Sequence, residues 1–255
     1  MQKLSAYAFP STGMECYYFT DKVDNAIDIL EHSHLFGSFP SRVNDPNDLR
    51  IQIVGWEKNV GRILENIDRA SFERNLNKAL SEKGCMDRSM RILCMAKAAK
   101  VDVDAEAQKM FWEKYAGKGF GVRFKFLVDS SFLIQPHAKE VFFDDVNYEV
   151  RVKELDASAI HADCDIAAMI GSGTFLRDLC YSKETKWCKE YEVRFVAPYT
   201  RLNLQMSSIT SREERYFVFN PKNLLEVRVG KAVCEVDFRT IQLSLNRYNL
   251  QLQKM

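Results

Sequence analysis

The stretch that decides the fold reads Lys183-Glu-Thr-Lys-Trp187-Cys-Lys-Glu190-Tyr-Glu192-Val-Arg194-Phe-Val-Ala-Pro198. From residue 190 to 196 polar and apolar letters alternate, which predicts an extended strand with two distinct faces. Glu190, Glu192 and Arg194 fall on one face, and the intervening apolar residues fall on the other and belong in a core. The polar face has two interpretations. It is either the solvated side of an edge strand or the floor of a polar cleft that holds a sugar or a phosphate.

Length and composition allow one large domain or two small ones. The chain has 255 residues, 46% of them hydrophobic and 28% charged, which is enough to build a full core. The net charge of +1 provides no global positive field, so nucleic acid is not indicated as a partner. No apolar run approaches the roughly 18 residues of a membrane-spanning helix, and the N-terminus lacks the apolar segment of a secretory signal. We therefore expect a cytoplasmic protein without a membrane segment.

The cysteines and histidines argue against a metal. Seven cysteines are an odd number, and no two are spaced as Cys-x-x-Cys, which disfavours both a zinc ribbon and a disulfide framework. Reduced and mostly buried thiols are the simplest explanation. His32-x-His34 is the only histidine cluster in the sequence, and no third ligand stands beside it. A surface pair between a helix and a strand is the simpler interpretation, and no metal is expected.

Alternation elsewhere predicts the rest of the sheet. The clearest strand is 120–126, whose inward residues are Phe120, Val122, Phe124 and Phe126. Further strands are expected at 91–96, 215–219 and 224–230, and a helix at 105–116. Helices and strands are mixed without regular strand–helix repeats, which favours an α+β fold with a mixed, mostly antiparallel sheet and packed helices. No linker divides the chain, so residues 1–255 are expected to form a single domain, with a C-terminal cap over 233–255.

Two further segments are candidate parts of a site. Asn44-Asp45-Pro46 lies in a stretch rich in Pro, Asn and Asp, which predicts a rigid loop, because proline restricts both itself and the preceding residue. These residues either serve turn chemistry alone or bind a ligand and brace a cleft. Trp112 and Tyr115 are three apart on the expected helix and so share a face. That pair is either part of a core or a platform for a ligand.

Several short motifs occur in a fixed order along the chain. They are Tyr17-Tyr18, Asp24-Asn25, Asn44-Asp45-Pro46, Trp112-x-x-Tyr115, Gly119-x-Gly121, Val146-Asn-Tyr148, the stretch quoted above from Lys183 to Arg194, and 225–230. In order and spacing this set resembles the bacterial family catalogued as domain of unknown function twenty-nine seventy-one, over roughly residues 15–232. The resemblance implies a bacterial protein. It implies little about function, because the family is named for having none assigned.

A second resemblance concerns chemistry. Glu190-Tyr-Glu192 with its following residues is similar to the Glu-x-Glu strand of mono-ADP-ribosyltransferases, and an aromatic helix and a strand precede it in a similar order. The resemblance implies an ADP-ribosyltransferase-like fold with NAD as substrate. Glu192 would then bind the ribose and stabilise the positive charge that develops on it as nicotinamide leaves, while Glu190 would align the acceptor. The sequence departs from that family at 94–96, which has no hydroxyl, and at Tyr17 and Tyr18, where a transferase carries Arg or His.

Three hypotheses for the polar stretch remain open. The first is an NAD- or nucleotide-using transferase or glycohydrolase, and the second is a non-catalytic module that binds a nucleotide or a protein in a bacterial defence or toxin system. In the third, Lys183, Glu190 and Arg194 form an internal ion network that only holds the sheet together. The candidate catalytic residues are Glu192 and Glu190, and the candidate ligand-binding residues are Tyr18, Asn44, Asp45, Trp112, Tyr115, Lys183 and Arg194.

Overall fold

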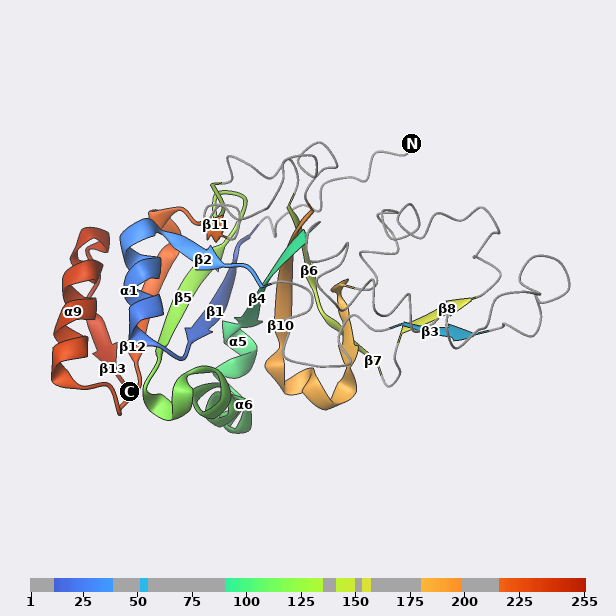
Figure 1. Ribbon diagram of the computed structural model, residues 1–255, viewed down its shortest axis with the longest axis horizontal. Helices are drawn as coiled ribbons and strands as arrows, with labels where there is room; N and C mark the ends of the chain where they lie inside the picture. The colour runs from blue at the N-terminus through green and yellow to red at the C-terminus, as the bar shows by residue number, and fades with distance from the viewer. Residues whose placement is uncertain are drawn as a thin grey trace, which may run out of the picture.

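The computed structural model describes residues 12–38, 51–54, 90–134, 141–149, 153–156, 180–198 and 216–255. Its centre is a seven-stranded sheet (Figure 1). In spatial order the strands are β13 (Leu252–Lys254), β12 (Leu224–Val229), β5 (Val122–Val128), β1 (Met14–Thr20), β4 (Met90–Lys97), β10 (Glu192–Pro198) and β6 (Phe142–Asp145). All neighbours are antiparallel except β12 and β13. The fold is therefore α+β with a mostly antiparallel sheet, as expected.

Smaller elements surround this sheet. Three two-stranded sheets pair β2 (His34–Phe36) with β11 (Tyr216–Val218), β3 (Ile51–Val54) with β8 (Lys153–Asp156), and β7 (Asn147–Glu149) with β9 (Ser182–Glu184). Within the described ranges the helices are α1 (Val23–His32), α5 (Ala98–Val101), α6 (Ala105–Met110), the π-helical turn η2 (Phe111–Tyr115) and α9 (Glu235–Leu245). The short 3₁₀ helices in the described part of the chain are η3 (Gly117–Gly119), η5 (Thr185–Glu190), η8 (Pro221–Asn223) and η9 (Asn246–Tyr248). No helix among the described residues is long and apolar enough to cross a bilayer.

One face of the sheet carries the main apolar core. Helices α1 and α9 lie side by side over this face (Figure 1) and contact each other. The buried residues of α1 are Ala26, Ile29 and Leu30, which recur at the spacing of one helical face. They join fully buried strand residues such as Phe124 and Phe126 in one continuous cluster. The alternation of the strands thus places their apolar side chains under the two helices.

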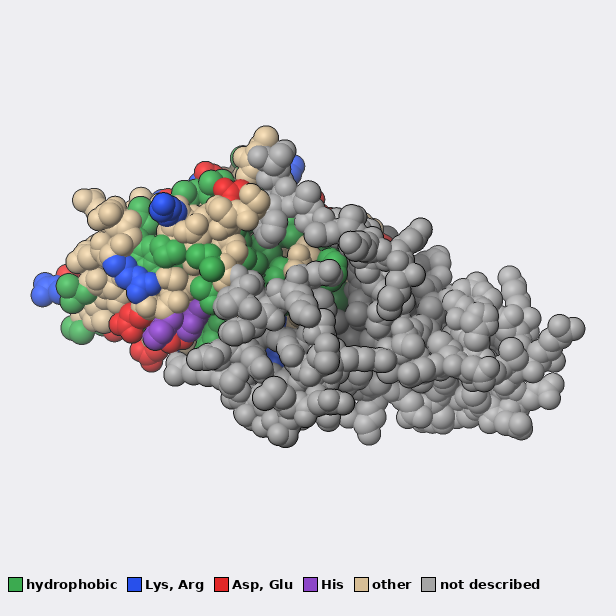
Figure 2. Space-filling model, turned by 90° about the horizontal axis from the view of Figure 1, so that it is seen from above, with side chains coloured by type: hydrophobic (Ala, Val, Ile, Leu, Met, Phe, Trp, Pro, Cys, Tyr) green, Lys and Arg blue, Asp and Glu red, His purple; other side chains and the backbone are tan. Residues whose placement is uncertain are grey.

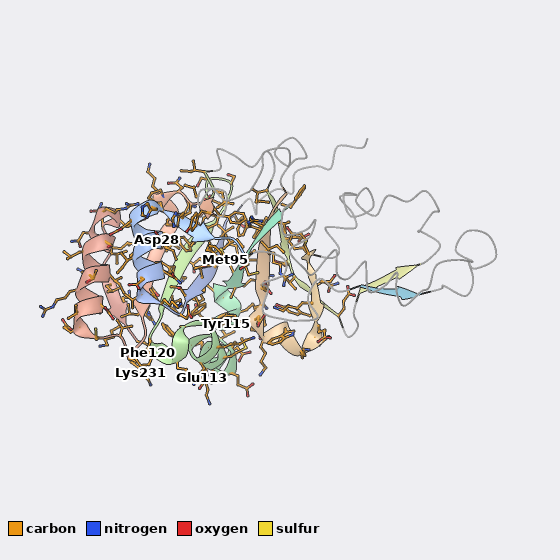
Figure 3. All side chains as sticks on the ribbon, in the orientation of Figure 1. Asp28, Met95, Glu113, Tyr115, Phe120 and Lys231 are labelled. Atoms are coloured by element: carbon orange, nitrogen blue, oxygen red, sulfur yellow. The ribbon has the colours of Figure 1, made fainter. Side chains whose placement is uncertain are left out.

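The strand predicted at 120–126 begins later than expected. Its inward residues Val122, Phe124 and Phe126 are fully buried, but Phe120 is 60% exposed, at the end of the turn that precedes β5 (Figure 3). Gly117 and Gly119 in that turn have φ of 55° and 92°, a backbone region that glycine adopts without strain. Phe120 still belongs to the turn, so the alternation of buried and outward side chains along β5 does not include it.

The opposite face of the sheet is covered differently. There α5 and η2 pack a smaller apolar cluster against Tyr17 of β1 and Ala96 of β4. Strands β1 and β4 pair only at Cys16 with Lys97 and at Tyr17 with Ala96, although both strands are longer. Beyond those two pairs the strands part at the middle of the sheet. The separation leaves room for side chains and for a pocket.

Candidate functional site

A pocket with a volume of about 180 Å³ opens where β1 and β4 part. Aromatic residues form much of its wall, namely Tyr17, Tyr18, Phe19, Phe36, Phe111 and Tyr115. The rings of Phe19 and Phe111 stack with centroids 4.8 Å apart, and those of Phe111 and Tyr115 lie 5.3 Å apart. Such a wall suits a flat or apolar group of a ligand.

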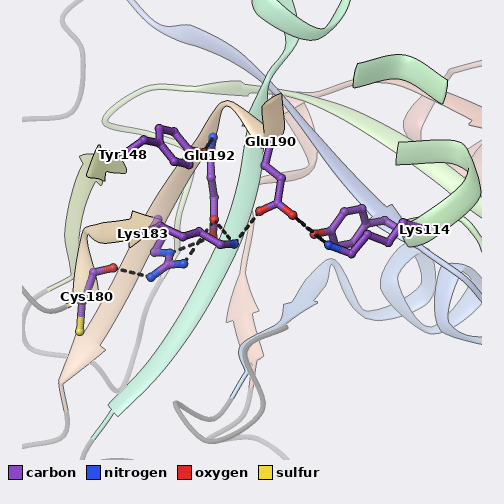
Figure 4. A network of polar contacts seen from close by, with 8 residues as sticks. Lys114, Tyr148, Cys180, Lys183, Glu190 and Glu192 are labelled. Carbon is purple, nitrogen blue, oxygen red and sulfur yellow. Dashed lines mark hydrogen bonds and ion pairs between the residues drawn. The ribbon is translucent and has the colours of Figure 1, made fainter. Parts of the chain in front are cut away.

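Charged side chains form the other part of the pocket, and Glu192 is their centre (Figure 4). Arg194 donates from Nε to Glu192 Oε1 at 2.8 Å and from Nη2 to Oε2 at 3.3 Å. Lys183 Nζ donates to the same Oε2 at 3.0 Å. Arg194 has no exposed surface and also donates from Nη1 to the carbonyl oxygen of Cys180 at 2.7 Å. These are buried charges that satisfy one another, as burial requires.

Glu190 joins the same network through Lys183. Lys183 Nζ lies 2.5 Å from Glu190 Oε2, so this one ammonium bridges both carboxylates. The other oxygen of Glu190 accepts hydrogen bonds from the Tyr115 hydroxyl and, at 3.2 Å, from Lys114 Nζ. Lys114 in turn lies 3.7 Å from the centre of the Trp187 ring, a cation–π contact. Three cations and two carboxylates therefore meet at this end of the pocket.

The backbone around the two glutamates differs from the predicted continuous strand. Glu190 ends the 3₁₀ turn η5, and Tyr191 has φ 45° and ψ 43°, so β10 begins only at Glu192. The left-handed conformation of Tyr191 turns the chain, which a uniform strand does not do. The Tyr191 hydroxyl donates to Asp104 at 2.9 Å, and the backbone N–H of Glu192 donates to the Tyr148 hydroxyl at 2.8 Å. Although Glu190 and Glu192 lie on different elements, their carboxylates lie close together, because both pair with the ammonium of Lys183.

The network decides which groups are charged. Burial alone would raise the pKa of Glu192, but the positive charges of Arg194 and Lys183 outweigh burial and lower it to about 2. Burial likewise acts to lower the pKa of Lys183, and the two carboxylates outweigh it, so that pKa is raised. Cys94, on β4 opposite Arg194, is different. Burial raises its pKa well above the usual value, and its thiol donates to Glu192, so it is not poised as a nucleophile.

The structure brings together most of the residues predicted for the site. Tyr18, Tyr115, Lys183, Glu190, Glu192 and Arg194 all line the pocket. The hydroxyl of Tyr18 accepts a hydrogen bond from the backbone of Phe36, another lining residue. Asn44 and Asp45 lie outside the described residues.

Trp112 does not line the pocket with Tyr115, and of its two interpretations, core or ligand platform, its burial fits the core. Trp112 is 7% exposed and packs edge-on against Phe19 at 5.9 Å. The helix changes to a π turn here, marked by the hydrogen bond from Ala116 N–H to the carbonyl of Phe111 at 3.0 Å. The wider turn puts Phe111, not Trp112, on the face of Tyr115. Sequence reasoning missed Phe111 and Lys114, and no local pattern marks where an α-helix widens.

The chain was compared with family models, with curated proteins and with solved structures, and none of the three comparisons finds a match. The two resemblances that the motif order suggests therefore stay predictions, and the function has to be argued from the pocket itself.

Proposed function

We propose that the pocket binds one end of a nucleotide and that the protein is an NAD-using transferase or glycohydrolase of the ADP-ribosyltransferase kind. The observation that carries the proposal is a buried, ionised carboxylate, Glu192, at a pocket walled by aromatic rings. The pocket volume of about 180 Å³ is below the roughly 300–1,000 Å³ of pockets that enclose a whole drug-sized ligand. It suits the nicotinamide end of NAD, with the remainder of the ligand outside.

The chemistry follows from the charge that develops during cleavage. When the bond between nicotinamide and ribose breaks, nicotinamide leaves with the bonding electron pair and positive charge spreads over the ribose. A carboxylate held in place beside that sugar stabilises the charge without having to reorganise. Glu192 fits this role because its low pKa keeps it ionised at neutral pH and Arg194 holds it at two points.

The acceptor completes the reaction. A water molecule or a nucleophilic side chain of a partner protein attacks the ribose, forms the new bond and loses a proton. Glu190 stands at the same end of the pocket, held by Tyr115 and Lys183, and is the residue proposed to align that acceptor. Tyr17 and Phe19 supply the rings beside the base.

A specific observation favours the second candidate, a non-catalytic binding module. Both oxygens of Glu192 already accept hydrogen bonds from Arg194 or Lys183, which offsets the charge that catalysis needs. Cys94 of β4, whose thiol donates a hydrogen bond to Glu192, stands where the transferases that this sequence resembles carry a hydroxyl. In this alternative the pocket recognises a nucleotide or a protein, as a sensor in a bacterial defence or toxin system does.

Titration calorimetry with NAD and an assay for released nicotinamide distinguish the candidates. For an enzyme we expect NAD binding and turnover, with turnover reduced at least about a hundredfold in Glu192→Gln. The matched control is Glu226→Gln, which removes a carboxylate that pairs with Arg123 and does not line the pocket. The control should leave turnover unchanged. NAD binding without turnover supports the module, and absence of both binding and turnover rejects NAD as the ligand.

A further inference from the structure

Asp28, His32 and His34 form a compact cluster where α1 ends and β2 begins. His32 Nδ1 lies 3.2 Å from Asp28 Oδ1, and His34 Nε2 lies 2.8 Å from Asp28 Oδ2. One potential metal-ligating atom from each residue falls within 4.8 Å of the other two. Two imidazoles thus face the two oxygens of one carboxylate, outside the pocket described above.

We propose that this cluster binds a divalent transition-metal ion of the zinc type, with Asp28, His32 and His34 as its three protein ligands. Imidazole nitrogen and carboxylate oxygen are the ligands that zinc takes besides thiolate, and a set of three leaves one position open for water. Tetrahedral bonds of about 2.1 Å place ligand atoms about 3.4 Å apart. The observed N–O distances of 2.8 and 3.2 Å are close to that separation.

The fold orients the three ligands before any ion arrives. Asp28 and His32 are four residues apart on α1, which puts them on one face of the helix (Figure 3 labels Asp28). Ser33, with φ 53° and ψ 45°, ends the helix in the left-handed conformation and turns the chain into β2. His34 is then held by stacking on the Tyr216 ring, with centroids 3.7 Å apart. A ligand set that the fold already orders loses little conformational freedom when it binds an ion.

The cluster is also open to solvent on one side. The side chain of His34 is 11% exposed and that of Asp28 27%, whereas that of His32 is 58% exposed. In Figure 2 the described histidines, in purple, lie at the surface directly beside acidic side chains. An ion can therefore enter past His32 and keep a water molecule at its open position.

The sequence alone predicts no metal here, because no third ligand stands next to the two histidines. The third ligand, Asp28, is one helical turn earlier and becomes a neighbour only when α1 forms. The competing arrangement is a cluster joined only by hydrogen bonds, in which His32 Nδ1 also lies 3.1 Å from the carbonyl oxygen of Asp28. The experiment has to distinguish a metal site from that arrangement.

The test uses the full chain, reduced and freed of metal with a chelator, and titrates it with Zn²⁺ alone in a calorimeter. We expect one ion per chain, and affinity at least about tenfold weaker in His32→Ala and in Asp28→Asn. His32 is exposed, so its variant removes a ligand without opening the core. The control is the double variant His137→Ala/His161→Ala, which removes the other two histidines of the sequence and should bind Zn²⁺ as the parent does.

Co²⁺ in place of Zn²⁺ identifies the ligands by absorption, because thiolate ligands add strong charge-transfer bands that imidazole and carboxylate do not. We expect visible Co²⁺ bands without thiolate bands, and their loss in His32→Ala. The proposal is overturned if the parent chain takes up no Zn²⁺. It is also overturned if both His32→Ala and Asp28→Asn bind Zn²⁺ as the parent does, or if thiolate bands show that cysteines hold the ion.

Discussion

Both faces of the central sheet contain fully buried side chains, but different interactions stabilise the two faces. On the face under α1 and α9, Phe126 has no exposed surface and packs against the rings of Phe132 and Phe219 at 5.5 and 4.9 Å. On the pocket face, Arg194 has no exposed surface either, and it contacts Glu192. An apolar ring gains free energy simply by leaving water. A charged group loses hydration, so its burial is favourable only with partners in place.

This difference teaches how each face responds to change. The apolar face depends on volume, and a substitution there costs in proportion to the space it leaves. The pocket face depends on pairing, and removing one member leaves another charge buried alone. The difference between the faces can therefore be tested by comparing the unfolding free energies of variants on each face with that of a variant at an exposed ion pair.

The largest effect is expected on the apolar face. Phe126→Ala removes a fully buried ring from the aromatic cluster and should lower the free energy of unfolding by about 4 kcal/mol. Urea denaturation followed by circular dichroism measures it. Phe126→Leu, which keeps most of the volume, is the control and should cost clearly less. Equal costs for the two variants would mean that volume does not govern this face.

The next effect tests pairing on the pocket face. Arg194→Met keeps much of the side-chain volume but removes the two hydrogen bonds to Glu192, and should cost about 3 kcal/mol in unfolding free energy. The double variant Arg194→Met/Glu192→Leu removes both charges and should be more stable than the single variant, since no carboxylate is left underpaired. If the double variant loses as much unfolding free energy as the two single variants combined, pairing does not distinguish the pocket face from the apolar face.

Acid should weaken the pocket face in a particular pH range. The pKa of Glu192 falls from 4.5 to about 2 on folding, so its contribution is present above about pH 4.5 and is lost as pH falls towards 2. By pH 3 the stability difference between the parent chain and Glu192→Gln should have shrunk by about 2 kcal/mol relative to pH 7. Urea denaturation of both proteins at each pH measures it. A difference that stays constant with pH would show that Glu192 is not held by its cations.

The smallest effect is expected at an exposed ion pair. Arg239 Nε lies 3.2 Å from Glu235 Oε1 on α9, and both side chains are mostly exposed. Glu235→Gln should change the free energy of unfolding by less than about 0.5 kcal/mol, because water already solvates both charges. The same urea measurement applies. A cost near that of Arg194→Met would show that burial is not what distinguishes the pocket network.

Particular residues show what sequence patterns can and cannot reveal. The alternation at Val122, Phe124 and Phe126 predicted a strand and its core face, because the period of a strand is local. The same reasoning was wrong at Phe120 and Glu190, where a turn interrupts the period. For Trp112 the pattern left a core and a ligand platform open, and the structure places this side chain in a buried contact with Phe19, outside the residues that line the pocket. The chemical types of the site, two carboxylates with an arginine and a lysine, were nevertheless all found in one stretch.

By itself the sequence determined the α+β class, the strands with clear alternation and most of the charged residues of the candidate site. Only the tertiary structure decided that Lys183 bridges Glu190 and Glu192, that Lys114 and Tyr115 approach from a helix far away in the chain, and that Asp28 meets two histidines. The physical reason is the distance along the chain over which each interaction acts. Backbone periodicity is set by near neighbours, whereas the pairing of buried charges depends on which distant segments the folded chain brings into contact.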